Sequence, residues 1–236
     1  MINTYSDIRT PPTLKLESYN SAPATLVADY TNTSAPVIRL SEKAYDVCAS
    51  MGKDSLNALA MILSHELAHH YKSHEYAGSY AFSNDKLSNQ NKTQLLQMEI
   101  EADETGTFYA YLAGYNSFDI QAKLIDNIYA KYGFPDKVKG YPSKTDRKKA
   151  GLEKLKNLQN LIPVFETGEV LFTLNYYAEA ADCFIYLINK FPSKEMYYNA
   201  GIAKLMQAIG LFDNEELPFA YPIEFEAKSR LTGKVV

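Results

Sequence analysis

The stretch SHELAHHYKSHE, residues 64–75, places four histidines and two glutamates within twelve positions. The chain has 236 residues, and these are its only histidines. Apolar residues recur at helical spacing before this stretch and within it: Leu56, Leu59, Ala60, Leu63 and Leu67. Because this spacing is that of an amphipathic helix, we expect the histidines to lie at the C-terminal end of a helix capped by Asp54 or Ser55.

Two of the histidines have the spacing of a metal site. Residues four apart on a helix share a face, so His65 and His69 can direct imidazole nitrogens at one ion. Glu66 lies one position round, where its carboxylate can take a proton from a metal-bound water without binding the metal. This HExxH arrangement is the signature of zinc metallopeptidases. It supplies two protein ligands, whereas a catalytic zinc normally has three.

The third ligand is not found within the same stretch. The extended signature HExxHxxGxxH requires Gly and His at positions where the chain has Lys72 and Glu75. His74 is out of register by one residue. We therefore expect His70 and His74 to be non-ligands.

A second acidic motif offers the missing ligand. In MEIEADETG, residues 98–106, Glu99 and Asp103 lie four apart on a predicted helix from 93 to 112. Glu99 can bind zinc, and Asp103 can accept a hydrogen bond from the distal nitrogen of a ligating histidine. The small Gly106 permits a close approach of the two helices. Glu101 points to another face, where we expect it to be solvated.

The two motifs together resemble a known family. HELAH, residues 65–69, followed some thirty residues later by EIEADETG, is similar to the gluzincin zinc metallopeptidases that include the HtpX heat-shock protease and the CAAX prenyl protease. The resemblance covers roughly residues 36–150, and the soluble members fit better than the membrane-embedded ones. It implies a gluzincin-type core with one Zn²⁺ per chain, held by His65, His69 and Glu99. Asp103 would then support a ligand without binding the metal.

A third family element is present in altered form. The family has a His-Pro pair followed by Arg near the active site, and here Tyr141, Pro142 and Arg147 hold the pattern with Tyr in place of His. A phenol can donate a hydrogen bond to a developing oxyanion, so Tyr141 is a candidate transition-state donor. Alternatively, the replacement of His by Tyr has removed the role of this position in catalysis. Ser143 with Asp146 also has the pattern of a helix start, which explains this stretch equally well.

These residues lead to one function and one alternative. The first is a zinc-dependent endopeptidase that hydrolyses peptide bonds in unstructured or misfolded polypeptides, with Glu66 as general base for a zinc-bound water. The strand PVIRL, residues 36–40, is expected to be a sheet edge to which an extended substrate can add. The alternative is a protein-binding module in which the zinc site is degenerate or structural.

The remaining patterns predict an α+β fold, mainly helical with a small sheet. TLVADY and VIRL, at residues 25–30 and 37–40, are expected to pair as a β-hairpin. A short helix follows the cap at Ser41, and a later helix runs from Ser117 to Tyr132. The expected divisions are an extended N-terminal arm, the metallopeptidase domain, helices that resemble tetratricopeptide repeats, and an irregular tail: 1–24, 25–158, 159–210 and 211–236.

The third of these divisions resembles a tetratricopeptide repeat of 34 residues. Small, aromatic and proline residues fall at the repeat's positions: Gly168, Tyr177, Ala180, Phe184 and Pro192. One and a half repeats cannot form a solenoid alone, so the helices would pack on the peptidase domain, continue in a longer chain or bind a protein partner. Alternatively they are ordinary packed helices of the main domain.

Composition excludes several classes of partner and site. The net charge is −4 with both signs mixed along the chain, so we expect no nucleic-acid binding. No apolar run approaches the ~20 residues of a transmembrane helix, and the N-terminus lacks signal-peptide regions. The protein is expected to be soluble: cytoplasmic if this is the whole chain, and in the periplasm or cell envelope if a leader has been removed. Cys48 and Cys183 are read as buried apolar residues.

Overall fold

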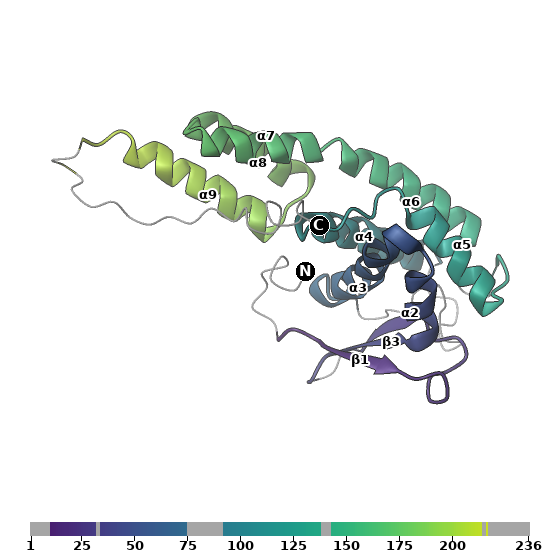
Figure 1. The fold of residues 1–236 in the computed structure, drawn as a ribbon. Coiled ribbons are helices and arrows are strands. Elements are labelled where there is room, and N and C mark those ends of the chain that lie inside the picture. The colour runs from purple at the N-terminus through teal and green to yellow at the C-terminus, as the bar shows by residue number, and fades with distance from the viewer. Residues whose placement is uncertain (1–9, 32–33, 75–91, 138–142, 214–215, 217–236) are drawn as a thin grey trace. The chain divides into compact units, whose positions relative to one another are not determined.

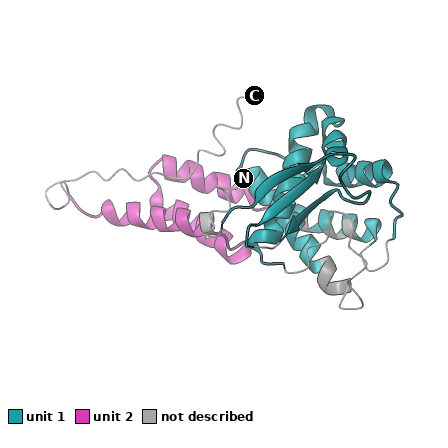
Figure 2. Ribbon diagram, turned by 90° about the horizontal axis from the view of Figure 1, so that it is seen from below, with its two compact units in different colours: residues 1–2, 8–156 teal, residues 3–7, 157–236 magenta. Residues whose placement is uncertain are grey.

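The structure is a computed structural model that describes residues 10–31, 34–74, 92–137, 143–213 and 216. The chain divides into two compact units: the described residues up to 156 belong to the first and those from 157 onward to the second (Figure 2). Within the described ranges, none of the helices combines the length and apolar character needed to cross a bilayer.

In the first unit, the three strands come first along the chain and the helices follow them (Figure 1). In chain order they are β1 (Thr13–Glu17), β2 (Ala28–Thr31), β3 (Val37–Ser41), α2 (Glu42–Ala49), the 3₁₀ turn η1 (Gly52–Asp54), α3 (Ser55–Tyr71), α4 (Lys92–Leu112), α5 (Gln121–Tyr132) and α6 (Lys144–Gln159). The last residues of α6 belong to the second unit. The fold is α+β and mainly helical, which confirms the fold class predicted from the sequence.

The three strands form one mixed sheet with β3 in the centre. β2 and β3 are antiparallel, with Asp29 opposite Arg39, as the predicted hairpin requires. β1 pairs in parallel with the other side of β3, and Leu14 lies opposite Ile38. Side chains alternate along β3: Ile38 and Leu40 are buried, whereas Arg39 points to the other face and pairs with Asp29. Helices α2 and α3 therefore cover the apolar side of the sheet.

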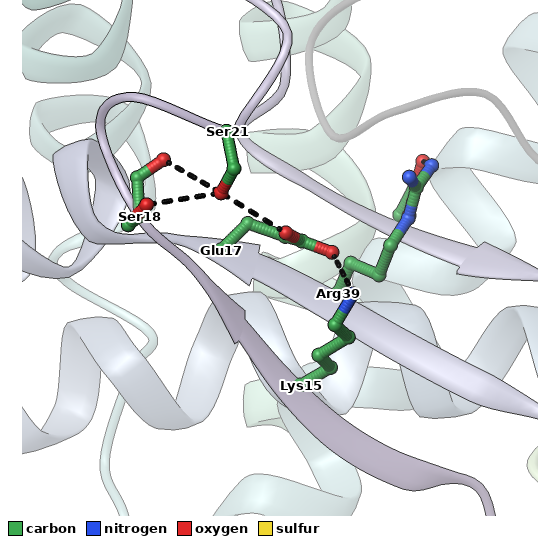
Figure 3. A network of polar contacts seen from close by, with 6 residues as sticks. Lys15, Glu17, Ser18, Ser21 and Arg39 are labelled. Carbon is green, nitrogen blue, oxygen red and sulfur yellow. Dashed lines mark hydrogen bonds and ion pairs between the residues drawn. The ribbon is translucent and has the colours of Figure 1, made fainter.

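Polar contacts order the end of β1 and the turn after it (Figure 3). Lys15 Nζ lies 2.8 Å from Glu17 Oε1. Ser21 Oγ donates to Glu17 Oε2 at 3.4 Å and lies 3.0 Å from Ser18 Oγ. The hydrogen bond from Lys15 lowers the pKa of the Glu17 carboxyl. Solvent screens this network because Lys15 is largely exposed, so its effect is on local order rather than on the core.

The core of the first unit lies between the sheet and the helices. α2 begins at the predicted cap, where Ser41 Oγ accepts a hydrogen bond from the Ala44 backbone N–H at 3.1 Å. Apolar side chains of the sheet, α2, α3 and α5 form one buried cluster that includes Leu40, Val47, Met61, Ile62 and Leu124. Eleven of the 17 residues of α3 are buried, and the histidines at its C-terminal end are among them.

Two details differ from the sequence-based expectations. β3 is not an edge strand, because β1 pairs with the side that was expected to be open. α5 begins at Gln121 rather than at Ser117. Asn116 Oδ1 accepts the backbone N–H of Phe118 at 3.3 Å, which forms a turn before the helix and leaves Ser117 outside the cap position.

The second unit consists mainly of helices packed in sequence: α7 (Ile162–Thr173), α8 (Tyr177–Lys190) and α9 (Lys194–Ile209). Gly168 permits the contact between α7 and α8, since a Cβ there would lie 2.9 Å from the Phe184 ring. Ala180 and Phe184 are fully buried on α8. Ser193 caps the start of α9, where its Oγ accepts the Met196 backbone N–H at 3.4 Å. Helices thus continue almost to residue 210, as predicted, while the tetratricopeptide resemblance stays a prediction.

Candidate metal centre

The C-terminal half of α3 brings two imidazoles together. His65 and His69 lie one turn apart on the face that meets α4, and each is 1% exposed. Their Nε2 atoms are 2.9 Å apart. Two nitrogens that converge in this way, inside a buried region, can bind one cation.

Glu99 of α4 completes the group from the facing helix. Its Oε2 lies 3.3 Å from His65 Nε2, and its Oε1 lies 3.6 Å from His69 Nε2. One donor atom from each of the three residues lies within 4.8 Å of the other two. Around a tetrahedral zinc, with each donor about 2.0–2.1 Å away, the donors are about 3.3 Å apart. The arrangement of His65, His69 and Glu99 therefore fits a metal ion with only small shifts.

The two helices approach closely enough for this because of a glycine. A Cβ at Gly106 would lie 2.8 Å from the backbone nitrogen of His65 and 2.8 Å from the backbone oxygen of Ser64. Any side chain at this position would push α4 away from α3. The predicted small-residue contact is present, and it lies beside the first histidine of the group.

Asp103 lies behind His65, on the side away from the Glu99 carboxylate. Its Oδ1 is 2.7 Å from His65 Nδ1, and both side chains are 1% exposed. When Nε2 of His65 faces the metal, Nδ1 carries the proton and donates to this carboxylate. If a metal is bound, this contact would fix both the tautomer and the ring orientation of His65.

The buried carboxylates make the region strongly favourable for positive charge. Burial alone would lower the pKa of His65, but Asp103 and Glu99 outweigh it and raise this pKa to about 9. Glu66, next to His65 on α3, is also fully buried. Buried charges are costly unless they are paired or coordinate a metal, so a divalent cation would offset the charge of these carboxylates.

The remaining two histidines are also buried. His70 faces β2, where its Nδ1 lies 2.9 Å from the Tyr30 hydroxyl. His74 Nδ1 lies 2.9 Å from Nδ1 of His69, and its Nε2 lies 3.6 Å from Glu101 Oε2. Burial lowers the pKa of His74 more than the nearby Glu101 raises it. Neither histidine belongs to the three-residue group, but sequence reasoning missed that His74 contacts His69.

The altered third motif is only partly visible. Tyr141 lies outside the described residues. Arg147 is within α6, but its side chain is not among those described. Ser143 Oγ accepts the Asp146 backbone N–H at 3.0 Å and donates to its carboxylate at 2.7 Å, which is the helix-start arrangement that the alternative interpretation expected.

No protein-family model, curated protein or solved structure matches this chain. The resemblance to the gluzincins therefore rests on the two motifs. What is established is a buried group, His65, His69 and Glu99, that could hold a metal ion.

Proposed function

We propose that the protein is a zinc-dependent endopeptidase. The observation that carries the proposal is the convergence of His65, His69 and Glu99 from two facing helices, with Glu66 buried beside the first ligand. Two imidazoles and one carboxylate are the ligand set of several catalytic zinc sites. A purely structural zinc is more often held by four ligands, with cysteine prominent among them. Cys48 and Cys183 are not part of this group.

Each residue has a defined task in the proposed reaction. His65, His69 and Glu99 hold the ion, and Asp103 holds His65 in the required tautomer. When bound, zinc lowers the pKa of a water molecule and polarises the scissile carbonyl. Glu66 accepts the proton of the attacking water as the new C–O bond forms and delivers it to the amine as the C–N bond breaks. Tyr141 is the proposed donor to the oxyanion, and Arg147 a supporting residue near it.

The proposed substrate is an unstructured or misfolded polypeptide. β3 cannot receive a substrate strand because both its sides are paired. Among the described residues β2 pairs with β3 alone, so its other side is an edge. Tyr30 of this strand contacts His70 of α3, which places the edge strand against the helix of the metal group. An extended peptide that adds to β2 as a further strand would form main-chain hydrogen bonds with β2 beside that helix.

The test combines a metal assay with three substitutions. Purified protein should contain one zinc per chain and cleave an unfolded substrate such as casein. Glu66→Gln should retain zinc and lose cleavage, whereas Glu99→Gln should lose both. Glu153→Gln, an exposed position on α6, serves as the matched control and should behave as wild type. Cleavage that survives in Glu66→Gln would exclude Glu66 as the general base.

A second candidate is favoured by the surface of the second unit. Its helices and the turn between α7 and α8 expose several large apolar side chains, each at least 45% exposed: Val170, Leu174, Tyr176, Tyr186, Tyr197, Tyr198 and Leu205. Where such residues form one contiguous patch, the patch is typical of a surface that binds another protein. In this alternative the zinc site is structural or degenerate, and the helices recognise a partner. Stoichiometric zinc without any cleavage, in wild type and Glu66→Gln alike, would favour it.

A further inference from the structure

The end of α3 has the hydrogen bonds of a Schellman motif. The Ser73 backbone N–H bonds to the carbonyl of His70 at 3.2 Å, and that of His74 bonds to the carbonyl of His69 at 3.0 Å. Ser73 has a φ of 56°, the left-handed conformation that this motif requires and that glycine usually supplies. The chain therefore turns back, so that His74 lies over the last turn of the helix.

This turn places two imidazoles in contact. A Schellman motif brings the second residue after the helix cap beside the residue five positions earlier, and the pair is usually apolar. Here the pair is His74 and His69, with ring centroids 5.0 Å apart. Their Nδ1 atoms are 2.9 Å apart, a hydrogen-bond distance. A histidine pair in place of an apolar pair requires a further explanation.

The orientation of His69 determines the direction of this hydrogen bond. Its Nε2 faces His65 Nε2 and the Glu99 carboxylate, on the side of the metal group. A ligating histidine that binds through Nε2 carries its proton on Nδ1, so Nδ1 of His69 is the donor. Nδ1 of His74 is then the acceptor. The proton of His74 lies on Nε2, which faces the Glu101 carboxylate at 3.6 Å.

We propose that His74 is a positioning residue for the metal site, which holds His69 as the Nδ1–H tautomer with Nε2 directed at the ion. This inference rests on the proposed metal site. It gives both histidine ligands a fixed partner: a carboxylate, Asp103, behind His65 and a neutral imidazole, His74, behind His69. The neutral partner adds no negative charge to a region that already holds Asp103 and Glu99.

The first test compares zinc affinity in two matched variants, by competition with a chromophoric chelator. His74→Phe keeps an aromatic ring but removes the acceptor, and we expect zinc affinity to fall about 10-fold to 100-fold. His70→Phe makes the same change at the adjacent buried histidine, which contacts Tyr30 instead of His69, and should bind zinc as wild type does. His74→Gln, whose amide oxygen can accept the same hydrogen bond, should recover part of the affinity. Equal zinc affinity in His74→Phe and wild type would overturn the inference.

A second measurement on wild-type protein does not depend on the folding of any variant. Long-range ¹H–¹⁵N spectra of the zinc-loaded protein should show His69 protonated at Nδ1 and His74 protonated at Nε2. Any other tautomer, or His74 bound to the metal, would overturn the inference while leaving the zinc site intact. If the wild-type protein binds no zinc, both this inference and the proposed function fail. The failure of this inference alone is therefore distinguishable from the failure of both.

Discussion

Asp103 Oδ1 lies 2.7 Å from Nδ1 of His65, and the two side chains come from different helices. The contact joins α4 to α3 beside the group of His65, His69 and Glu99, and leaves Nε2 of His65 directed at Glu99. The negative charge of Asp103 is also the largest of the contributions that raise the pKa of His65. The role of Asp103 can be separated into its charge and its hydrogen bond.

Asp103→Asn keeps an acceptor oxygen and removes the charge, whereas Asp103→Ala removes both. We expect zinc affinity to fall about 10-fold in the first variant and towards 100-fold in the second, measured by chelator competition. Asp126→Asn is the control, since this carboxylate on α5 is 45% exposed and pairs with Lys144 and Lys148. Unchanged affinity in Asp103→Ala would show that the contact does not orient His65.

Gly106→Ala tests whether the close approach of α3 and α4 holds the group together. The added Cβ would lie 2.8 Å from backbone atoms of Ser64 and His65, which cannot move aside as a flexible side chain can. We expect the free energy of unfolding to fall by about 1–3 kcal/mol, measured by urea denaturation with chelator present. Zinc affinity should fall as well, because Glu99 moves away with α4.

The control for this substitution is another helical glycine. Gly201 in α9 has no atoms within 4 Å of the position of a Cβ, so Gly201→Ala meets no obstacle. It should raise the free energy of unfolding by about 0.5–1 kcal/mol through helix propensity alone. A Gly106→Ala protein as stable as wild type would contradict the interpretation of Gly106 as a contact residue.

The sequence predicted the parts of the molecule that depend on local spacing. Two pairs of residues spaced four apart each define one helix face: His65 with His69, and Glu99 with Asp103. Gly106 indicates where these two faces pack against each other. The pairing of β1 with β3 left no such local signal, because it is a parallel pairing across about twenty residues. The alternation of Leu14 and Leu16 with polar residues was the available hint, but both side chains are more than half exposed.

The role of His74 was hidden for a different reason. A Schellman motif is recognised in a sequence by glycine at the left-handed position, and this chain has Ser73 there. Without a glycine at this position, the sequence predicts only that His74 lies beyond the end of the helix. Only the backbone turn brings it back over His69.

Tyr132→Phe tests a link between the end of α5 and the strand region. The Tyr132 hydroxyl donates to the carbonyl oxygen of Leu26 at 2.9 Å and lies 2.5 Å from Ser41 Oγ. Removing it leaves a partly buried carbonyl without this donor, so we expect a loss of about 1–2 kcal/mol in urea denaturation. Tyr197→Phe, at a position 59% exposed, should change stability by less than about 0.5 kcal/mol. Equal effects at both positions would show that the hydroxyl of Tyr132 contributes nothing specific.

The two cysteines should differ sharply in reactivity. Burial raises the pKa of the Cys48 thiol to about 12, and it also raises the pKa of the partly exposed Cys183. The thiolate is the reactive form, so at pH 8 a disulfide reagent should modify Cys183 first and Cys48 only as the protein opens. Cys183→Ser identifies the faster phase. Two equally fast phases would contradict the burial of Cys48.

The raised pKa of Cys48 also predicts a pH dependence of stability. The unfolded thiol ionises near its ordinary pKa of 9, whereas the folded thiol keeps its proton until about pH 12. The unfolded state therefore binds fewer protons in this window, and the free energy of unfolding falls as pH rises from 9 towards 12. Cys48→Ala removes this contribution, so its stability should fall less than that of wild type between pH 8 and pH 10.5. Parallel losses in the two proteins would show that other groups, among them Tyr132 with its pKa raised to about 12 by burial, account for the alkaline destabilisation.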